Sequence, residues 1–219
     1  MEALTQRLDR NKTTLAIGTI WLFQISAIVG MTLGFSDWFL PKTPINLSII
    51  ALCLLWLFPI AGRKTFITAI SLFSIGMTVE ALGIRNDWIF GPYYYGDNLG
   101  PKILGVPLLI GVNWMMLTFV TAAVASKLVR SVWSKILLGS TLMVLLDLLI
   151  EHSAYGFNFW FFEGNTVPFR NYIAWLIIGM FLHTIYQFLA LKGDAKISAH
   201  IYLSQLVFFG YFFFADGIL

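Results

Sequence analysis

The sequence predicts an all-α fold, a polytopic membrane protein built as a bundle of about seven transmembrane helices. Apolar residues make up 58% of its 219 residues and charged residues only 11%, whereas soluble domains carry roughly 25% charged residues. The mean hydropathy is correspondingly high, at +0.81. Long apolar runs recur along the whole chain, so we expect a single integral membrane domain over residues 1–219.

Seven apolar stretches of about 18–23 residues are each long enough to cross a hydrocarbon core of about 30 Å as a helix. In chain order they are Thr14–Gly34, Pro44–Ala61, Thr65–Gly83, Ile103–Ala125, Val132–Ile150, Asn171–Leu191 and Ser198–Ala215. Charged residues precede the first stretch, as in a signal peptide, but its apolar run is too long and has no clear small-residue cleavage site. We therefore predict that it is retained as a span.

Lysine and arginine residues gather at alternate ends of these spans. One side carries Arg7, Arg10, Lys12, Arg63, Lys64, Lys127, Arg130, Lys135, Lys192 and Lys196, and the other carries Lys42, Arg85, Lys102 and Arg170. The side with more cations is usually cytoplasmic. We therefore expect a multi-pass protein of the cell inner (plasma) membrane, with its N-terminus in the cytoplasm and its C-terminus outside.

The two long connections fall on the predicted outer side, at Ile84–Lys102 and Glu151–Arg170. The first contains WIFGPYYYG, in which glycine and proline among the rings predict a turn. Non-helical backbone at membrane depth must be covered by protein or line a cavity. We therefore predict a re-entrant or lid-like segment over a pocket, although an interfacial belt of aromatic residues would also explain most of these rings.

Three carboxylic acids lie in or at the ends of apolar spans, where an ionisable group costs about 2.5–3.5 kcal/mol at a helix centre. Glu80 lies about one turn from the outer end of the third span, and Asp147 and Glu151 close the fifth span in LLDLLIEH. Residues four apart share a helix face at about 6 Å. Two carboxyls this close in a low dielectric resist ionising together, so they can supply an acid and a base. The alternative is structural pairing with cations at the membrane edge.

Several other site classes are disfavoured by the sequence. The single cysteine, Cys53, excludes an intramolecular disulfide and a cysteine-based metal site. His152 follows Glu151, but no histidine spacing supports a metal site, so we expect no metal. Walker-type glycine loops, Gly-x-Ser-x-Gly and His-Glu-x-x-His are absent from the sequence, and no basic run suggests nucleic acid.

Four motifs in the middle of the chain have a recognisable pattern. They are TPINLSI at 43–49, FGPYYYGDNLGPKILGVPLLIGVNW at 90–114, LDLLIEHSAYGFNFWFF at 146–162 and VPFRNYIAW at 167–175. Together they resemble the membrane carotenoid-biosynthesis proteins, a family that includes the carotenoid 1,2-hydratases. The long pattern from Phe90 to Trp114 is the most specific of the four. One departure is His152, which stands where members of that family usually have proline.

The resemblance implies a helical bundle and a cofactor-independent enzyme that adds water to the terminal 1,2 double bond of an acyclic (ψ) carotenoid end. A buried carboxyl would protonate C2, ring faces would stabilise the tertiary cation at C1, and a second carboxylate would activate water. The expected proton donor is Asp147 or Glu80, and Glu151 is expected to activate water. The residues expected to bind substrate are Trp88, Phe90, Tyr93, Tyr95, Asn113, Trp114, His152, Asn171 and Trp175.

Two other functions fit the same residues. A carotenoid cyclase would use the same acid to form a cation but would lose a proton instead of gaining water. A non-enzymatic carotenoid- or lipid-binding membrane protein would use the acids for structure alone. The expected partners of the hydratase are a carotenoid of the lycopene or γ-carotene type, water, the lipid bilayer and other enzymes of the carotenoid pathway.

Overall fold

The protein is described here by a computed structural model, which covers residues 2–58 and 62–215. Residues 59–61, at the predicted end of the second span, lie outside the described residues. The long helices are α1 (Glu2–Thr32), α3 (Thr43–Leu57), α4 (Arg63–Arg85), α5 (Leu108–Leu128), α6 (Val132–Ala154), α7 (Phe169–Phe188) and α8 (Ala195–Phe214). A short helix α2 (Ser36–Phe39) and the 3₁₀ helix η1 (Leu40–Lys42) lead into α3, and a second 3₁₀ helix, η2 (Glu163–Asn165), precedes α7.

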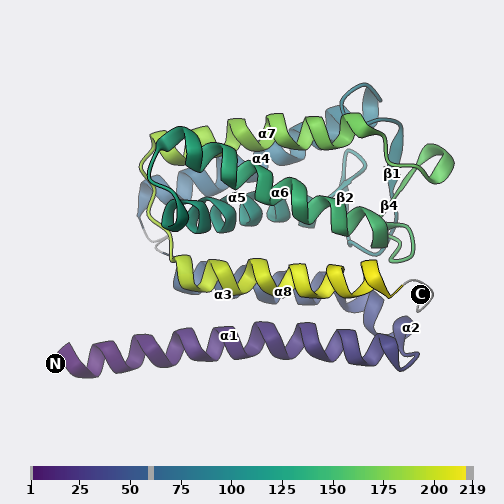
Figure 1. Ribbon diagram of the computed structural model, residues 1–219. Helices are drawn as coiled ribbons and strands as arrows, with labels where there is room; N and C mark the ends of the chain where they lie inside the picture. Colours follow the sequence, from purple (N-terminus) through teal and green to yellow (C-terminus); the bar gives the residue numbers. More distant parts are fainter. Residues whose placement is uncertain (1, 59–61, 216–219) are drawn as a thin grey trace.

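Each predicted span overlaps one long helix over most of its described residues, and the all-α membrane bundle is confirmed in this respect. Six helical stretches of the described chain are long and apolar enough to cross a membrane. They are Arg10–Thr32, Ser36–Leu57, Arg63–Arg85, Leu108–Leu128, Val132–Ala154 and Ala195–Phe214. The seventh helix, α7, is not among them, because Asn171, His183 and Gln187 lower its mean hydropathy. It nevertheless packs mainly against α6 and also contacts α5 and α4 (Figure 1).

The predicted start of the fourth span at Ile103 is wrong, because a β-hairpin occupies its first residues. Strands β2 (Lys102–Ile103) and β3 (Val106–Pro107) pair antiparallel, with Lys102 opposite Pro107. The turn between them places Leu104 and Gly105 at φ values of 52° and 85°, in the left-handed region that glycine adopts without strain. Helix α5 therefore begins only at Leu108, directly after Pro107.

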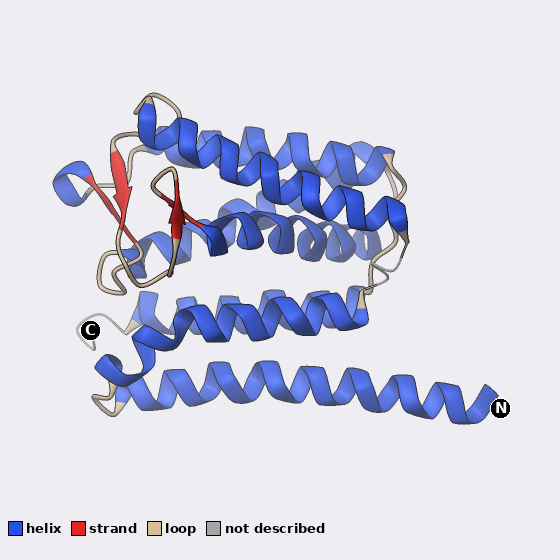
Figure 2. Cartoon of the chain, turned by 180° about the vertical axis from the view of Figure 1, so that it is seen from behind, coloured by secondary structure: helices blue, strands red, loops and turns tan. Residues whose placement is uncertain are grey.

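The long helices are arranged in layers, and each runs antiparallel to the long helix before it in the chain (Figures 1 and 2). Helix α1 forms one outer layer, α3 and α8 lie next to it, and α5 and α6 separate these from α4 and α7. Helix α5 contacts α3, α4, α6, α7 and α8 and carries the longest set of buried residues. A helix that is apolar on all sides is stable in this central place. The outward faces of the surrounding helices expose large apolar side chains, as expected where lipid is the solvent.

A small β cap covers one end of the bundle, and we call this the sheet end. Strand β1 (Tyr93–Tyr95) pairs antiparallel with β4 (Trp160–Phe162), with Tyr94 opposite Phe161. Both strands lie at the end where α4 and α6 finish and where α5 and α7 begin (Figure 2). The two long connections that carry most of the predicted motifs therefore meet over the same ends of the same four helices.

Candidate active site

A small cavity lies beneath the β cap, between α4, α5, α6 and α7. Its volume is about 30 Å³, enough for about one water molecule. It is lined by three acids, two asparagines and a shell of rings and aliphatic side chains. The lining residues are Glu80, Phe90, Tyr93, Tyr95, Ile110, Asn113, Trp114, Asp147, Ile150, Glu151, Trp160, Phe162, Asn171 and Trp175. No lysine or arginine is among these described lining residues, so no cation side chain compensates the acids there.

Glu80 is held by three hydrogen-bond donors. The phenol oxygens of Tyr93 and Tyr95 donate to Oε2 at 2.5 and 2.8 Å. The indole nitrogen of Trp114 donates to Oε1 at 2.8 Å. Only 3% of Glu80 is exposed, and hydrogen bonds to both oxygens stabilise the ionised form of a carboxyl group. The three donors therefore fix the position of both carboxyl oxygens of Glu80.

Asp147 and Glu151 share one amide. The side-chain nitrogen of Asn171 donates to Asp147 Oδ2 at 3.1 Å and to Glu151 Oε1 at 3.0 Å. The other oxygen of Glu151 accepts from the indole nitrogen of Trp160 at 2.7 Å. Asp147 Oδ1 has no hydrogen-bond partner among the described residues, although Asp147 is 1% exposed. This oxygen differs from the other five in the three acids, because each of the others accepts a hydrogen bond.

Strand alternation explains how the YYY sequence builds this site. Successive side chains of a strand point to opposite faces. Tyr93 and Tyr95 are therefore both buried against Glu80, whereas Tyr94 is exposed and stacks on Phe161 of β4. Gly91, at φ 112°, permits the sharp turn that starts the strand after α4. The turn at Gly91 and Pro92 thus sets which of the three tyrosines point toward Glu80.

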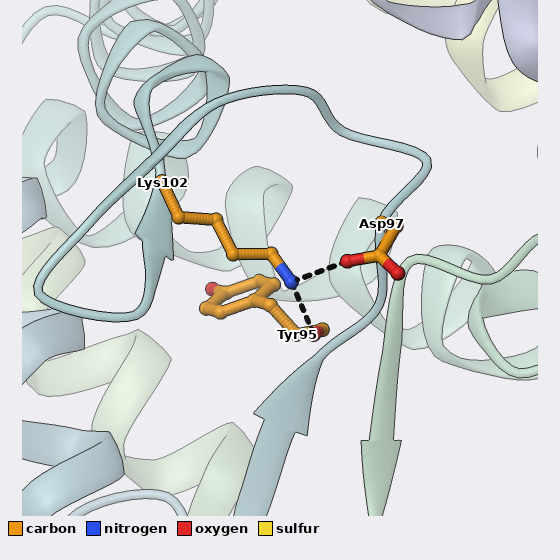
Figure 3. Close-up of polar contacts among 3 residues, drawn as sticks. All are labelled: Tyr95, Asp97 and Lys102. Atoms are coloured by element: carbon orange, nitrogen blue, oxygen red, sulfur yellow. Dashed lines mark hydrogen bonds and ion pairs between the residues drawn. The ribbon is translucent and has the colours of Figure 1, made fainter.

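A polar contact holds the end of β1 to the hairpin that follows it (Figure 3). The Lys102 ammonium group donates to the carbonyl oxygen of Tyr95 and to Asp97 Oδ1, both at 2.9 Å. The Asp97 side chain is almost fully exposed, and a pair of this kind contributes little stability because water and salt screen it. The contact with the backbone carbonyl is therefore the one that restrains the cap.

Burial raises the pKa of Tyr93 and of Tyr95 above the ordinary tyrosine value, and the nearby charge of Glu80 raises both further. Both phenols therefore stay protonated, and remain donors, at any physiological pH.

These raised pKa values predict a fall in stability at alkaline pH. An unfolded tyrosine ionises near pH 10, but the folded protein keeps both phenol protons. The unfolded state then binds fewer protons, so the free energy of unfolding falls as pH rises above about 10 and is unaffected by these groups below it. We expect Tyr93→Phe to flatten this decline in thermal unfolding curves between pH 9 and 11. Tyr94→Phe, at the exposed neighbour, should follow the wild-type curve, and a Tyr93→Phe curve as steep as wild type would contradict the assignment.

Rings surround the acids on the remaining sides of the cavity. Trp114 stacks on Trp175 with ring centroids 4.0 Å apart and planes inclined by 19°. Tyr93 also contacts Phe90 and Phe162, with centroids 5.9 and 5.4 Å apart. A cation in this cavity would face several π systems in addition to the carboxylates.

Gly76 of α4 lets Trp114 come close enough to reach Glu80. A Cβ atom at position 76 would lie 2.6 Å from Cβ of Trp114. We therefore expect Gly76→Ala to lower the stability by about 1–3 kcal/mol, since overpacking displaces a fully buried ring, and to reduce activity by moving Trp114. Differential scanning fluorimetry in detergent measures this effect. Gly210→Ala of α8 is the matched control, because its Cβ would meet its nearest atom only at 4.0 Å. We expect the unfolding temperature of Gly76→Ala to lie below that of the wild type, and the unfolding temperature of Gly210→Ala to lie at or above it.

The structure brings together most of the residues predicted for the site. All three predicted acids line one cavity, and Phe90, Tyr93, Tyr95, Asn113, Trp114, Asn171 and Trp175 line it with them. Trp88 is 71% exposed and lies outside it. His152 is also exposed, because it points away from the face shared by Asp147 and Glu151, and its ring contacts Phe213 of α8. These two predicted binding residues are therefore not part of the cavity.

Sequence reasoning missed four lining residues, namely Ile110, Ile150, Trp160 and Phe162. Trp160 is the most important of them because it donates to Glu151. The sequence showed Trp160 only as one ring in the FNFWFF run. Its side chain points toward the cavity because β4 pairs with β1.

The fold and the site define a multi-pass helical membrane protein with three buried carboxyl groups in an aromatic pocket. Residues 44–219 match the model of the family described as "Carotenoid biosynthesis protein". The chain therefore belongs to the carotenoid biosynthesis protein family, which confirms the resemblance noted from the motifs and gives it a role in carotenoid biosynthesis.

One characterised relative also matches. The chain is 29% identical over 147 residues to the bisanhydrobacterioruberin hydratase of Haloarcula japonica. The match covers 60% of this chain and 48% of that relative, so the chain spans about half the length of the protein it resembles. No solved structure matches the chain.

Proposed function

We propose that this protein is a carotenoid 1,2-hydratase, which adds water to the terminal double bond of an acyclic carotenoid end in the cavity beneath the β cap. The observation that supports this most directly is the asymmetry among the three acids. One carboxyl oxygen is unpaired, and the others are already hydrogen-bonded. Family membership and the hydratase relative support the same reaction class.

Asp147 is the proposed proton donor. Three carboxylates in one small cavity without a lining cation repel one another strongly in a low dielectric, so one of them is stabilised as the neutral acid. Glu80 accepts three hydrogen bonds and Glu151 accepts two, which favours their ionised forms. Asp147 accepts only one. Its proton on Oδ1 would pass to C2 of the substrate, and the π electrons of the double bond would form the new C–H bond.

The tertiary cation then left at C1 would be stabilised by Glu80 and by the rings around it. Each ring face contributes about 0.5–2 kcal/mol to holding a cation, and a preorganised charge aimed at the developing cation is worth about 10²–10³ in rate. This role needs no proton transfer from Glu80. It explains why its oxygens are occupied by Tyr93, Tyr95 and Trp114.

Glu151 is the proposed base. A water oxygen attacks C1 and its proton passes to Glu151, so that one C–O bond forms and the product gains one water. Asn171, which contacts both carboxyls, holds Asp147 and Glu151 on the same side of the reacting end. The proton gained by Glu151 returns to Asp147 through water, and the enzyme is restored without a cofactor.

Substrate binding requires the β cap to move. A cavity of about 30 Å³ holds a water molecule but not a branched isoprenoid end. The cap is built from two short strands and a hairpin, and elements with few backbone hydrogen bonds open at low free-energy cost. We propose that Phe90 to Val106 acts as the lid, that the sheet end faces the outside of the plasma membrane, and that the N-terminus is cytoplasmic. Lycopene or γ-carotene is the proposed substrate.

The product mass tests the proposal. The protein is expressed in a host that makes lycopene or γ-carotene, and the carotenoids are analysed by chromatography and mass spectrometry. We expect a product heavier by one water. A new product of unchanged mass would instead indicate a cyclase. Unchanged substrate in a lycopene-making host and in a γ-carotene-making host would contradict catalysis on these carotenoids.

A further inference from the structure

A second and much larger pocket lies on the other side of the bundle, between α1, α3 and α8. Its volume is about 380 Å³, within the range of small-molecule binding sites. Most of its lining is apolar and aromatic. Leu22, Trp38 and Ile45 at its rim are more than half exposed, so the pocket opens on the lipid-facing surface.

Polar side chains with unsatisfied hydrogen-bonding groups line this apolar pocket. Gln205 of α8 is 2% exposed, and its side-chain nitrogen has no partner among the described residues. Asn46 of α3 donates weakly to Gln24 at 3.5 Å, and its side-chain oxygen is also unpaired. A buried polar atom without a partner costs free energy that a bound ligand can recover. One unpaired group is a donor and the other an acceptor, and a hydroxyl group can both donate and accept a hydrogen bond.

The pocket also adjoins the candidate active site. Phe157 and Phe159 line it, and Phe159 contacts Trp160, with ring centroids 5.9 Å apart. Trp160 in turn lines the acid cavity and donates to Glu151. Residues 157–160, at the junction of the α6–β4 connection with β4, therefore contribute side chains to both the apolar pocket and the acid cavity.

We propose that this pocket is a second binding site, specific for a long acyclic isoprenoid that carries one hydroxyl group. The apolar wall accommodates the chain, which enters from the bilayer. The hydroxyl group donates to Asn46 Oδ1 and accepts from the side-chain nitrogen of Gln205. The choice of an isoprenoid follows from the family's role in carotenoid biosynthesis, and the pocket itself does not depend on the proposed hydration reaction.

Equilibrium binding to the full-length protein in phosphatidylcholine nanodiscs tests the site. The probes are radiolabelled geranylgeraniol, a C20 isoprenoid alcohol, and the matching C20 hydrocarbon without the hydroxyl group. We expect the alcohol to bind at least tenfold more tightly, about the effect of one or two recovered hydrogen bonds. The double variant Asn46→Leu with Gln205→Leu should bind both probes alike.

A matched pair on α1 locates the site without altering the buried polar groups. Ser26 is exposed and lines the pocket, whereas the neighbouring Ile25 is exposed but does not line it. Ser26→Phe should abolish binding of the alcohol, and Ile25→Phe should leave it unchanged. Equal binding of the two probes, no binding of either, or unaltered binding by Ser26→Phe would each overturn the proposal.

A variant in the acid cavity separates the test of this binding site from the test of the proposed hydration reaction. Asp147→Asn should still bind geranylgeraniol with wild-type affinity, whether or not the protein hydrates carotenoids. Failure of the hydration assay therefore leaves the binding result interpretable, and the reverse also holds.

Discussion

Replacing Asp147 with asparagine is expected to abolish formation of the hydrated carotenoid, with a rate loss of at least about 100-fold. General acid catalysis is typically worth about 10²–10⁴ in rate, and an amide has no acidic proton to give to C2. Asparagine has nearly the same shape, so it keeps the contact with Asn171 and leaves Glu80 and Glu151 in place. The measurement is the rate of product formation in isolated membranes supplied with lycopene.

The amount of folded protein must be measured in the same membranes. Asp147→Asn should be present at the wild-type level and should unfold at a similar temperature, because Asp147 is proposed to be uncharged already and the amide oxygen still accepts from Asn171. Asp97→Asn is the control substitution, since this acid is exposed and lies outside the cavity. Wild-type turnover by Asp147→Asn would show that another group supplies the proton.

Glu80→Gln is expected to lower the rate about 100-fold for a different reason. Its charge is proposed to stabilise the cation at C1, and the loss of one preorganised electrostatic group costs about 10²–10³ in rate. Glutamine also replaces one carboxyl oxygen with a nitrogen donor, which then faces either Tyr93 and Tyr95 or Trp114, groups that themselves donate in the wild type. We therefore expect a lower unfolding temperature in addition to the rate loss.

The two variants differ in a way that tests the division of roles. Asp147→Asn should lose activity and keep its stability, whereas Glu80→Gln should lose both. The double variant Tyr93→Phe with Tyr95→Phe removes two of the donors but keeps the Glu80 charge, so it should retain more activity than Glu80→Gln. If Asp147→Asn were the less stable variant and Glu80→Gln the stable one, the roles proposed for the two acids would be reversed.

The membrane class and most of the site residues were predictable from the sequence, because they depend on local patterns. Apolar runs of sufficient length give helices in lipid whatever their neighbours are. The four-residue spacing of Asp147 and Glu151 fixes both on one face of α6. The predicted start of the fourth span was five residues too early, since the β2–β3 hairpin depends on its turn and on pairing that apolarity alone does not indicate.

The sequence by itself determined that this is a helical membrane protein of the carotenoid biosynthesis family with three acids that needed an explanation. Only the tertiary structure decided which residues surround each acid. Glu80 is separated from Asp147 by 67 positions and from Tyr93 by 13, and the folded chain places all of them in one cavity. The pairing of β1 with β4 brings Trp160 to Glu151, and the packing of α6 against α7 brings Asn171 between Asp147 and Glu151. The hydrogen bonds on which the proposed roles of the three acids rest come from distant segments, so no local pattern could have assigned them.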